Sequence, residues 1–284
     1  MRTKNTRQNA IKNEAHYDKL YANVNINGIL KKLYNFDRFF EDATKTDTSW
    51  VGLYQDELAE KIKGKKILEL GCGDCTNAAV MSALGAEVFA NDISQVSGSI
   101  VEKLNANFDF EFPLTFIEGS FLNAKLKDNS FDYIIGKAFV HHLTIEQEHE
   151  FTEKIVQILK PNGVVRYFEP AINNKLLDEL RWMVPVPGRP SKLRKKKFKA
   201  WMAKDPHPER DNSSKHYKAI GNNYFKKVSV LPIGGIERIH RLLPKGKWNR
   251  KFRRWAFKIE RLIPNFIHTP IARSQVITYT NPKK

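Results

Sequence analysis

The chain of 284 residues carries 48 Lys and Arg against 31 Asp and Glu, a formal net charge of +17, and 41% of its residues are hydrophobic. This length suits one large domain with a substantial core, and no apolar run reaches the roughly 18 to 20 residues that a membrane span needs. The N-terminal residues lack the apolar segment of a secretory signal, and two cysteines give no disulfide framework, so we expect a cytoplasmic protein.

Charge is divided unevenly along the chain. Residues 171–284 hold 28 Lys and Arg against 7 Asp and Glu, whereas residues 1–170 hold 20 against 24. The second part therefore has a net charge of +21 and the first part of −4. So basic a region predicts an anionic partner, with solvated Lys and Arg faces as the alternative.

Helix and strand patterns alternate along the first 170 residues. Apolar residues at helical spacing predict helices within residues 1–63. Strands are then predicted at 65–70, 86–93, 114–119, 131–139 and 164–169, and helices at 76–85, from the second strand to about 107, and at 145–160. Pro161 and the turn Asn162-Gly163 are expected to end the last of these helices.

This alternation predicts an α/β fold with a doubly wound, mostly parallel sheet and helices on both faces. Two late strands, at 226–233 and 274–280, bring the sheet to seven strands. The insertion between the fifth and sixth strands has about 56 residues, and the next has about 40. Loops of this length usually carry lids or binding elements.

The stretch ILELGCGDCTNAAV, residues 67–80, follows the first strand and opens a helix. It contains both cysteines, Cys72 and Cys75, but a structural zinc site needs four ligands and here there is one pair. Asp74 between them disfavours a redox pair, because a redox thiol needs a lowered pKa. We therefore expect no metal site here. Glycines at a strand-to-helix turn let the backbone approach a ligand, and the helix N-terminus offers free N–H groups.

Five segments occur in an order that resembles a known family. ILELGCGDC, VFANDIS, FIEGSF, NSFDYIIGKAFVHHL and ILKPNGVV, within residues 65–170, are similar to the class I S-adenosylmethionine-dependent methyltransferases, in particular to their large small-molecule branch. That fold ends in an antiparallel hairpin of strands, which suits the late pair here. The resemblance implies a seven-stranded Rossmann-like sheet and S-adenosylmethionine as the cofactor.

Several cofactor contacts follow from the resemblance at the ends of the first two strands. Glu69 would face the amino group of the methionine moiety, directly or through water. Gly71, Cys72 and Gly73 would pass beneath the cofactor. Asp92 would hold the two ribose hydroxyls.

The resemblance implies further contacts beyond the next strands. Ile93 would pack on the adenine ring. Ser120 stands where the family often has an Asp that binds the adenine amino group, and the N–H of Phe121 could serve there instead. Gly136 and Lys137 would line the methionine and methyl end.

The resemblance also implies different functions for three segments of the chain. Residues 1–63 would form an N-terminal helical lid, in which Tyr17 and Tyr21 are candidate cofactor contacts or simple packing residues. Residues 64–170 would bind the cofactor. Residues 171–284 would supply basic insertions that face the substrate or a membrane, together with the last two strands.

Three residues beyond strands four and five are candidates for proton removal from a methyl acceptor. His141 and His142 suit this role because imidazole titrates near neutrality, although a helix start with one buried ring explains them too. Glu169 is expected to hold the acceptor or to cap the turn at Pro170. The polar loop of residues 207–217 is either an acceptor-binding element or no more than a loop.

Residues 246–263 predict a basic amphipathic helix. Trp248, Phe252, Trp255, Ile259 and Leu262 form one stripe at helical spacing, and Lys and Arg cover the other faces. Such a helix can lie in a membrane interface, or the stripe packs on the domain. Nucleic acid would use the same charges, but it would not need the aromatic stripe.

The sequence therefore predicts methyl transfer to a lipophilic or anionic small molecule near a membrane surface. Its partners would be a small-molecule or lipid-like acceptor and, peripherally, the inner face of an anionic membrane. Two alternatives stay open: an RNA methyltransferase that uses the basic half, and a protein that binds S-adenosylmethionine without catalysis.

Overall fold

The computed structural model describes residues 14–284 except 16, 187 and 204–206. One seven-stranded sheet runs through it, in the order β3-β2-β1-β4-β5-β7-β6. Strands β1 to β5 pair in parallel, and β7 is antiparallel to both β5 and β6. The strands are β1 (Lys66–Leu70), β2 (Glu87–Asp92), β3 (Thr115–Glu118), β4 (Phe131–Lys137), β5 (Leu159–Pro170), β6 (Phe225–Ile233) and β7 (Ser274–Pro282). The predicted α/β fold with an antiparallel last strand is confirmed.

Neighbouring residues of the central strands belong to two separate apolar cores. In β1, Ile67 belongs to a core that includes α6 (Thr76–Ala83) and α7 (Gln95–Asn107). The next residue, Leu68, belongs to a second core with α8 (Ile145–Ile158) and α11 (Ser214–Tyr224). Since side chains alternate across a strand, the cores lie on opposite faces of the sheet, as expected of a buried parallel sheet.

The structure differs from the predicted boundary between α8 and β5. The helix ends at Ile158, and β5 begins at Leu159 rather than near residue 164. The pairing of β4 with β5 shifts between Phe131, opposite Leu159, and Tyr133, opposite Val164. This irregularity absorbs Pro161 and its neighbours, which a regular ladder would not tolerate because proline has no N–H to donate.

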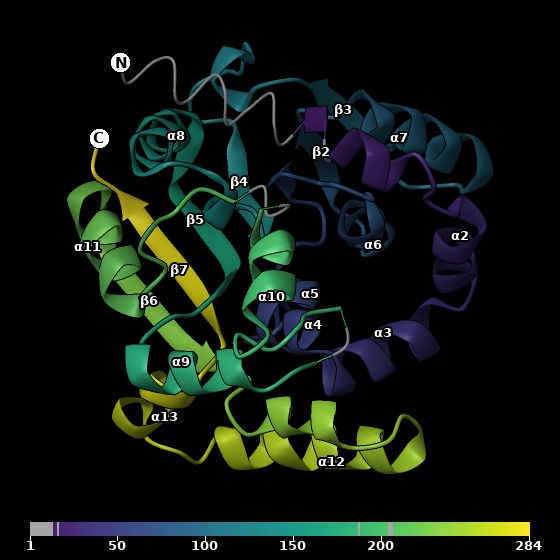
Figure 1. Ribbon diagram of the computed structural model, residues 1–284. Coiled ribbons are helices and arrows are strands. Elements are labelled where there is room, and N and C mark those ends of the chain that lie inside the picture. Colours follow the sequence, from purple (N-terminus) through teal and green to yellow (C-terminus); the bar gives the residue numbers. More distant parts are fainter. Residues whose placement is uncertain (1–13, 16, 187, 204–206) are drawn as a thin grey trace.

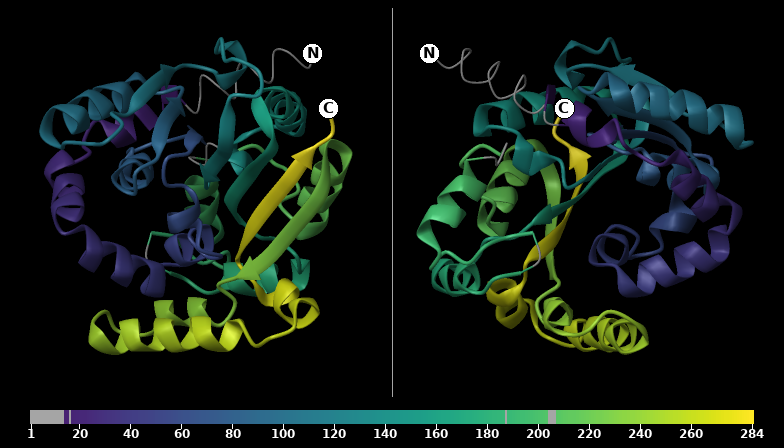
Figure 2. Two further views of the ribbon diagram at one scale, coloured as in Figure 1. Left: turned by 180° about the vertical axis from the view of Figure 1, so that it is seen from behind. Right: turned by 45° about the vertical axis from the view of Figure 1, so that its right-hand side comes forward.

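Helices from both ends of the chain meet at one end of the sheet. The N-terminal helices are α2 (Ile26–Tyr34), α3 (Phe36–Thr46), α4 (Thr48–Leu53) and α5 (Leu58–Lys61); part of the predicted lid, residues 1–13 and 16, lies outside the described residues. The insertions supply α9 (Lys175–Met183), α10 (Lys195–Met202), η3 (Glu237–Leu242), α12 (Lys247–Glu260) and α13 (Asn265–Ile271). Figure 1 and Figure 2 show α9, α12 and α13 across the lower end of the molecule, with α12 beside α3.

Residues 246–263, predicted to form a basic amphipathic helix, do so over most of their length as α12. The described residues include no helix with the length and apolar character needed to cross a bilayer.

Candidate active site

A cavity of about 620 Å³ lies at the carboxyl ends of β1, β2 and β4, where ligands bind in open parallel sheets. Nine of the ten predicted cofactor-binding residues line it: Glu69, Gly71, Cys72, Gly73, Asp92, Ile93, Ser120, Phe121 and Lys137. His141, His142, Tyr17 and Tyr21 also line it. The fold therefore gathers residues from a stretch of more than 120 positions around one space.

Gly136 and Glu169 stand behind the cavity wall. Gly136 lies in β4, and a Cβ there would approach Cδ1 of Tyr167 to 2.9 Å, so its position is explained by packing. Glu169, at the end of β5, is completely buried. Neither residue is among those that line the cavity.

The turn between β1 and α6 is shaped by two glycines in the left-handed region. Gly71 has a φ of +66°, and a Cβ there would lie 2.3 Å from Cδ2 of Phe139. Gly73 has a φ of +55°, and a Cβ there would lie 2.7 Å from the hydroxyl of Tyr21. Both glycines therefore leave room for aromatic rings of this chain, which the sequence had not indicated. Cys75, at the end of this turn, also has a positive φ, of 57°.

The two thiols of this turn are packed into the protein. Cys72 and Cys75 are both buried and free, with their Sγ atoms 3.7 Å apart. Burial, more than any other influence, raises the pKa of Cys72 well above its usual value. A thiol with a raised pKa is a poor nucleophile and a poor metal ligand. Small side chains that fit a tight loop therefore account for both cysteines.

Glu69 is a buried carboxyl on the cavity wall with one oxygen left unpaired. Its Oε1 atom accepts a 2.7 Å hydrogen bond from Nδ2 of Asn77, and Asn77 in turn accepts one from the hydroxyl of Tyr54. Its Oε2 atom is buried without a hydrogen-bond partner among the described residues. Burial raises the pKa of Glu69 to about 8. A cationic group in the cavity would satisfy this oxygen, so Glu69 fits the amino group of S-adenosylmethionine.

Asp92 is held at the end of β2 by backbone donors. Its Oδ2 atom accepts from the N–H of Gly73 at 2.8 Å, and its Oδ1 atom accepts from the N–H of Ser94 at 2.9 Å. Each carboxylate oxygen can accept a further bond. Asp92 therefore has a fixed orientation and spare acceptor capacity, which suits a pair of ribose hydroxyls.

Glu169 binds the segment that carries the two histidines. Its Oε1 atom accepts from the N–H groups of Phe139 and Val140 at 2.9 and 2.7 Å. Its Oε2 atom lies 2.7 Å from Nδ1 of His141. Because a carboxylate can only accept, Nδ1 of His141 carries the proton and donates it, and Nε2 is left as an acceptor. Glu169 thus orients His141, a different role from capping the turn at Pro170.

Three imidazoles come together at the edge of the cavity. The ring of His207 stacks on that of His141 at 4.8 Å between centroids and lies 4.3 Å from that of His142. The hydroxyl of Tyr17 is 3.3 Å from Nε2 of His142. Potential ligand nitrogens of the three rings lie within 4.8 Å of one another, the one such group of three metal-ligand side chains in the described part of the chain. The sequence left the loop of residues 207–217 open as an acceptor-binding element, but it did not place His207 beside the other two rings, because 65 positions separate His207 from His142.

Comparison with known proteins relates the central part of the chain to a protein family. Residues 68–167 match the family model described as a methyltransferase domain. The seven-stranded order with an antiparallel β7 agrees with that match. Residues 68–167 are a class I methyltransferase domain. Domains of this class use S-adenosylmethionine as the methyl donor.

Two curated relatives share about a hundred residues with this methyltransferase domain. One is the mitochondrial ubiquinone biosynthesis O-methyltransferase of Schizosaccharomyces pombe, 33% identical over 102 residues. The other is the cypemycin N-terminal methyltransferase of a Streptomyces species, 31% identical over 104 residues. The matches cover 35% and 36% of this chain, and only 36% and 40% of the relatives.

Solved structures share the fold at low sequence identity. A SAM-dependent methyltransferase from Archaeoglobus fulgidus has a TM-score of 0.51 and 15% identity, and the match covers 85% of this chain and 99% of that one. The phosphoethanolamine N-methyltransferase 2 of Haemonchus contortus has a TM-score of 0.50 and 15% identity, over 92% of this chain and 61% of that one. These likenesses concern the fold alone.

Arg210 lies in the polar loop of residues 207–217 and contacts the segment that carries the two histidines. Its side chain is almost completely buried, and Nη1 donates to the carbonyls of Val140 and Leu143 at 2.7 and 2.9 Å. Nη2 donates to Glu148 at 2.5 Å, and His216 also contacts that carboxylate, at 2.7 Å. The polar loop at 207–217 therefore holds carbonyl groups of the histidine segment, whose N–H groups Glu169 binds, and it brings His207 to the cavity.

Proposed function

We propose that this protein transfers a methyl group from S-adenosylmethionine to a hydroxyl oxygen of a lipophilic or anionic small molecule at a membrane surface. The observation that carries the chemistry is the hydrogen-bonded pair of His141, which lines the cavity together with Glu69, and Glu169, which lies behind the cavity wall. A buried acceptor for a cation and an oriented imidazole meet in one space. The O-methyltransferase name of one curated relative supports oxygen as the acceptor atom.

The polar groups of the cavity support a donor half. Glu69 would bind the amino group through Oε2, and Asp92 would accept from the ribose hydroxyls. The adenine would lie against Ile93, near Ser120 and the N–H of Phe121, and Lys137 would line the methionine end. When bound, S-adenosylmethionine supplies a methyl group that is already activated as part of a sulfonium.

The acceptor half of the cavity needs orientation and a proton acceptor. Nε2 of His141 would take the hydroxyl proton as the acceptor oxygen forms its bond to the methyl carbon. Glu169 holds the ring at 2.7 Å and would stabilise the imidazolium that results. Arg210 and Glu169 fix the backbone on either side of this ring, so little reorganisation is needed when the proton moves.

A position at a membrane is supported by the stripe on α12. Trp248 and Trp255 expose 80% and 53% of their surface, whereas Phe252 and Ile259 are partly buried. The helix instead packs on the domain through other residues, which include Ala256 and Phe257. An outward Trp face beside Lys and Arg is the arrangement of helices that lie in a membrane interface. A lipophilic acceptor dissolved in that membrane would then lie close to the enzyme.

The experiment is to incubate the protein with methyl-labelled donor and separate lipid, small-molecule and RNA fractions of a cell extract. We expect label in the lipid or small-molecule fraction, and none with the Asp92→Ala variant. Label in RNA would replace this proposal by an RNA methyltransferase. Donor binding without transfer to any fraction would indicate a non-catalytic binding protein.

A further inference from the structure

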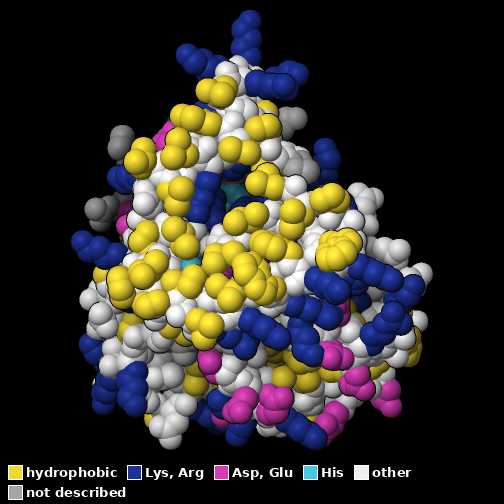
Figure 3. All heavy atoms as spheres, turned by 90° about the horizontal axis from the view of Figure 1, so that it is seen from below, with side chains coloured by type: hydrophobic (Ala, Val, Ile, Leu, Met, Phe, Trp, Pro, Cys, Tyr) yellow, Lys and Arg dark blue, Asp and Glu magenta, His cyan; other side chains and the backbone are white. Residues whose placement is uncertain are grey.

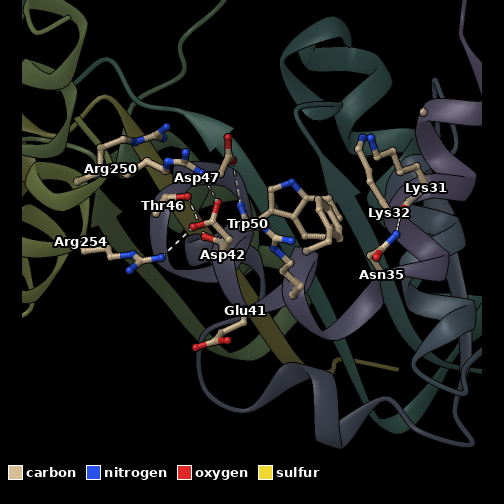
Figure 4. Close-up of a pocket in the computed structure, with 15 residues that line it drawn as sticks. Lys31, Lys32, Asn35, Glu41, Asp42, Thr46, Asp47, Trp50, Arg250 and Arg254 are labelled. Atoms are coloured by element: carbon tan, nitrogen blue, oxygen red, sulfur yellow. Dashed lines mark hydrogen bonds and ion pairs between the residues drawn. The ribbon is translucent and has the colours of Figure 1, made fainter. Parts of the chain in front are cut away.

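A second cavity, of about 940 Å³, opens between the N-terminal helices and α12. We call it the basic cleft. It is lined by Gly28, Lys31, Lys32, Asn35, Arg38, Phe39, Glu41, Asp42, Ala43, Thr46, Asp47, Trp50, Arg250, Arg253 and Arg254. Figure 4 shows Lys31 and Lys32 on one side and Arg250 and Arg254 on the other, with Trp50 between them. Six cationic side chains thus converge on one space from segments about 200 positions apart.

The acidic residues of the basic cleft already have partners. Asp42 binds Arg254 at 2.9 Å and Arg250 more loosely at 3.7 Å. Glu41 pairs with Lys45 at 2.5 Å, and Asp47 accepts from the N–H groups of Ser49 and Trp50 at the start of α4. These contacts leave little negative charge for the remaining cations.

Three cations of the basic cleft have no ion-pair partner among the described residues: Lys31, Lys32 and Arg38. Lys32 lies 5.6 Å from the ring centre of Phe39, and that contact does not neutralise its charge. Like charges on one wall repel each other unless an anion lies between them. The unpaired charge therefore favours an anionic ligand in this cleft.

The surroundings of the basic cleft favour a lipid as the source of that anion. Large apolar side chains are exposed on the elements at the same end of the molecule: Leu176 and Leu180 on α9, Ile239 and Leu242 on η3, Trp248 and Trp255 on α12, Leu262 after it, and Phe266 and Ile267 on α13. Figure 3 looks at this end and shows hydrophobic side chains gathered across it, with Lys and Arg around them and a hollow among them. Exposed apolar area of this extent is unusual for a face that meets only water.

The basic cleft also adjoins the cavity of the methyltransferase domain. Trp50 lines the cleft, and Nζ of Lys137, which lines the other cavity, lies 4.9 Å from the centre of its ring. Trp50 stacks on Tyr54, which donates to Asn77 beside Glu69. A headgroup held in the cleft would therefore lie next to the donor site.

We propose that the basic cleft binds the phosphate headgroup of an anionic membrane lipid, while the exposed apolar side chains around it enter the bilayer. This inference rests on the membrane position proposed above. Phosphate suits the cleft because Lys and Arg from opposite walls can contact several of its oxygens. Lys31, Lys32, Arg38 and Arg250 would provide these contacts, and none of them is in the site for methyl transfer.

The test measures co-sedimentation with phosphatidylcholine vesicles, with and without phosphatidic acid, at about 0.15 M salt. The cleft variant is Lys31→Gln/Lys32→Gln/Arg38→Gln. The matched control, Lys218→Gln/Lys226→Gln/Lys227→Gln, removes the same charge from exposed positions on α11 and β6. None of these six side chains forms an ion pair with a residue that the structure describes, so both variants should fold, which circular dichroism checks.

We expect the cleft variant to lose at least about tenfold in affinity for vesicles with phosphatidic acid, and the control no more than about twofold. Binding to pure phosphatidylcholine and methyl transfer to a soluble acceptor should stay the same in both. Glycerol phosphate should compete at the cleft in the native protein. Equal losses of vesicle affinity in the two variants, or no competition by glycerol phosphate, would mean that the vesicles attract the basic surface as a whole. Either result would overturn the headgroup site in the basic cleft. A third variant, Trp248→Ser/Trp255→Ser, tests the membrane position separately. Loss of binding to all vesicles in this variant alone would support that position.

Discussion

Nδ2 of Asn77 donates a 2.7 Å hydrogen bond to Oε1 of Glu69 and thereby fixes a buried carboxyl whose other oxygen has no partner among the described residues. Burial, which outweighs the hydrogen bond from Asn77 and the positive charge of Lys137, raises the pKa of this carboxyl from 4.5 to about 8. A cation that entered the cavity would stabilise the ionised form further. Donor binding and the ionisation of Glu69 are therefore coupled.

This coupling predicts a pH dependence of donor affinity. Below about pH 8 Glu69 is mostly protonated, so binding of an ammonium group must first remove that proton. We expect affinity to rise about tenfold from pH 6 to pH 7, and less steeply from pH 7 to pH 8. Isothermal titration calorimetry measures this, and Glu69→Gln should abolish the rise. A native affinity that is flat over this range would remove Glu69 from the donor site.

The same carboxyl predicts how stability depends on pH in the donor-free protein. A folded pKa above the unfolded value means that the folded state binds the proton more tightly. The contribution of this proton to the free energy of unfolding is therefore fully present below about pH 4.5 and is lost as pH rises to about 8. Urea denaturation should show the native protein losing stability relative to Glu69→Gln across this window. A constant difference would contradict the raised pKa.

The His141–Glu169 pair predicts which histidine serves the reaction. His141→Gln should keep donor affinity and lose roughly 10²- to 10⁴-fold in turnover. His142→Gln should lose less, because Glu169 does not orient that ring. His149→Gln, on α8 beside Tyr224, is the matched control. Single-turnover measurements separate the three variants.

Two outcomes would change this assignment of the histidines. Equal turnover in His141→Gln and the native protein would leave orientation alone as the source of catalysis. Loss of native turnover on treatment with a chelator, restored by a divalent metal, would instead give the three-imidazole group a metal-binding role.

The close approach of Phe139 to Gly71 predicts that alanine substitutions at Gly71 and at Gly64 lower the stability of the protein by different amounts. Gly64 has a φ of +67° with nothing within 4 Å of a Cβ, whereas a Cβ on Gly71 would collide with Phe139. Gly64→Ala should cost about 1 to 2 kcal/mol from the left-handed backbone alone. Gly71→Ala should cost a further 1 to 3 kcal/mol, roughly, from overpacking. Equal midpoints of urea unfolding in the two variants would show that Phe139 moves aside freely.

The exposed Trp face of α12 predicts membrane binding. Trp248→Ser/Trp255→Ser should fold, because both rings are largely exposed, and should lose binding to anionic vesicles. Tyr34→Ser, which removes an exposed ring from α2, should bind as the native protein does. Co-sedimentation with structured RNA as competitor is the measurement. A protein that ignores vesicles but binds RNA with a steep salt dependence would favour the RNA alternative.

The local sequence was sufficient for the strands, the helices and the glycine turn. Hydrophobic periodicity and turn residues act over a few positions, so the alternation of β1 to β5 with their helices could be predicted, and residues 67–80 with Asp92 indicated a donor site. The predicted boundary between α8 and β5 was wrong. Pairing of Leu159 with Phe131 in β4, a tertiary contact, makes the strand begin at Leu159 and extends it through Pro161.

Contacts between distant segments were decided only by the tertiary structure. Periodicity carries no information on which loop will reach which turn, so nothing in the sequence joined Arg210 to Val140, His207 to His141, or Arg254 to Asp42. The sequence by itself determined that this chain has a class I methyltransferase core and a basic second half. The packing of the two insertions on that core decided which histidine is oriented, and that unpaired Lys and Arg line a cleft beside an exposed apolar face.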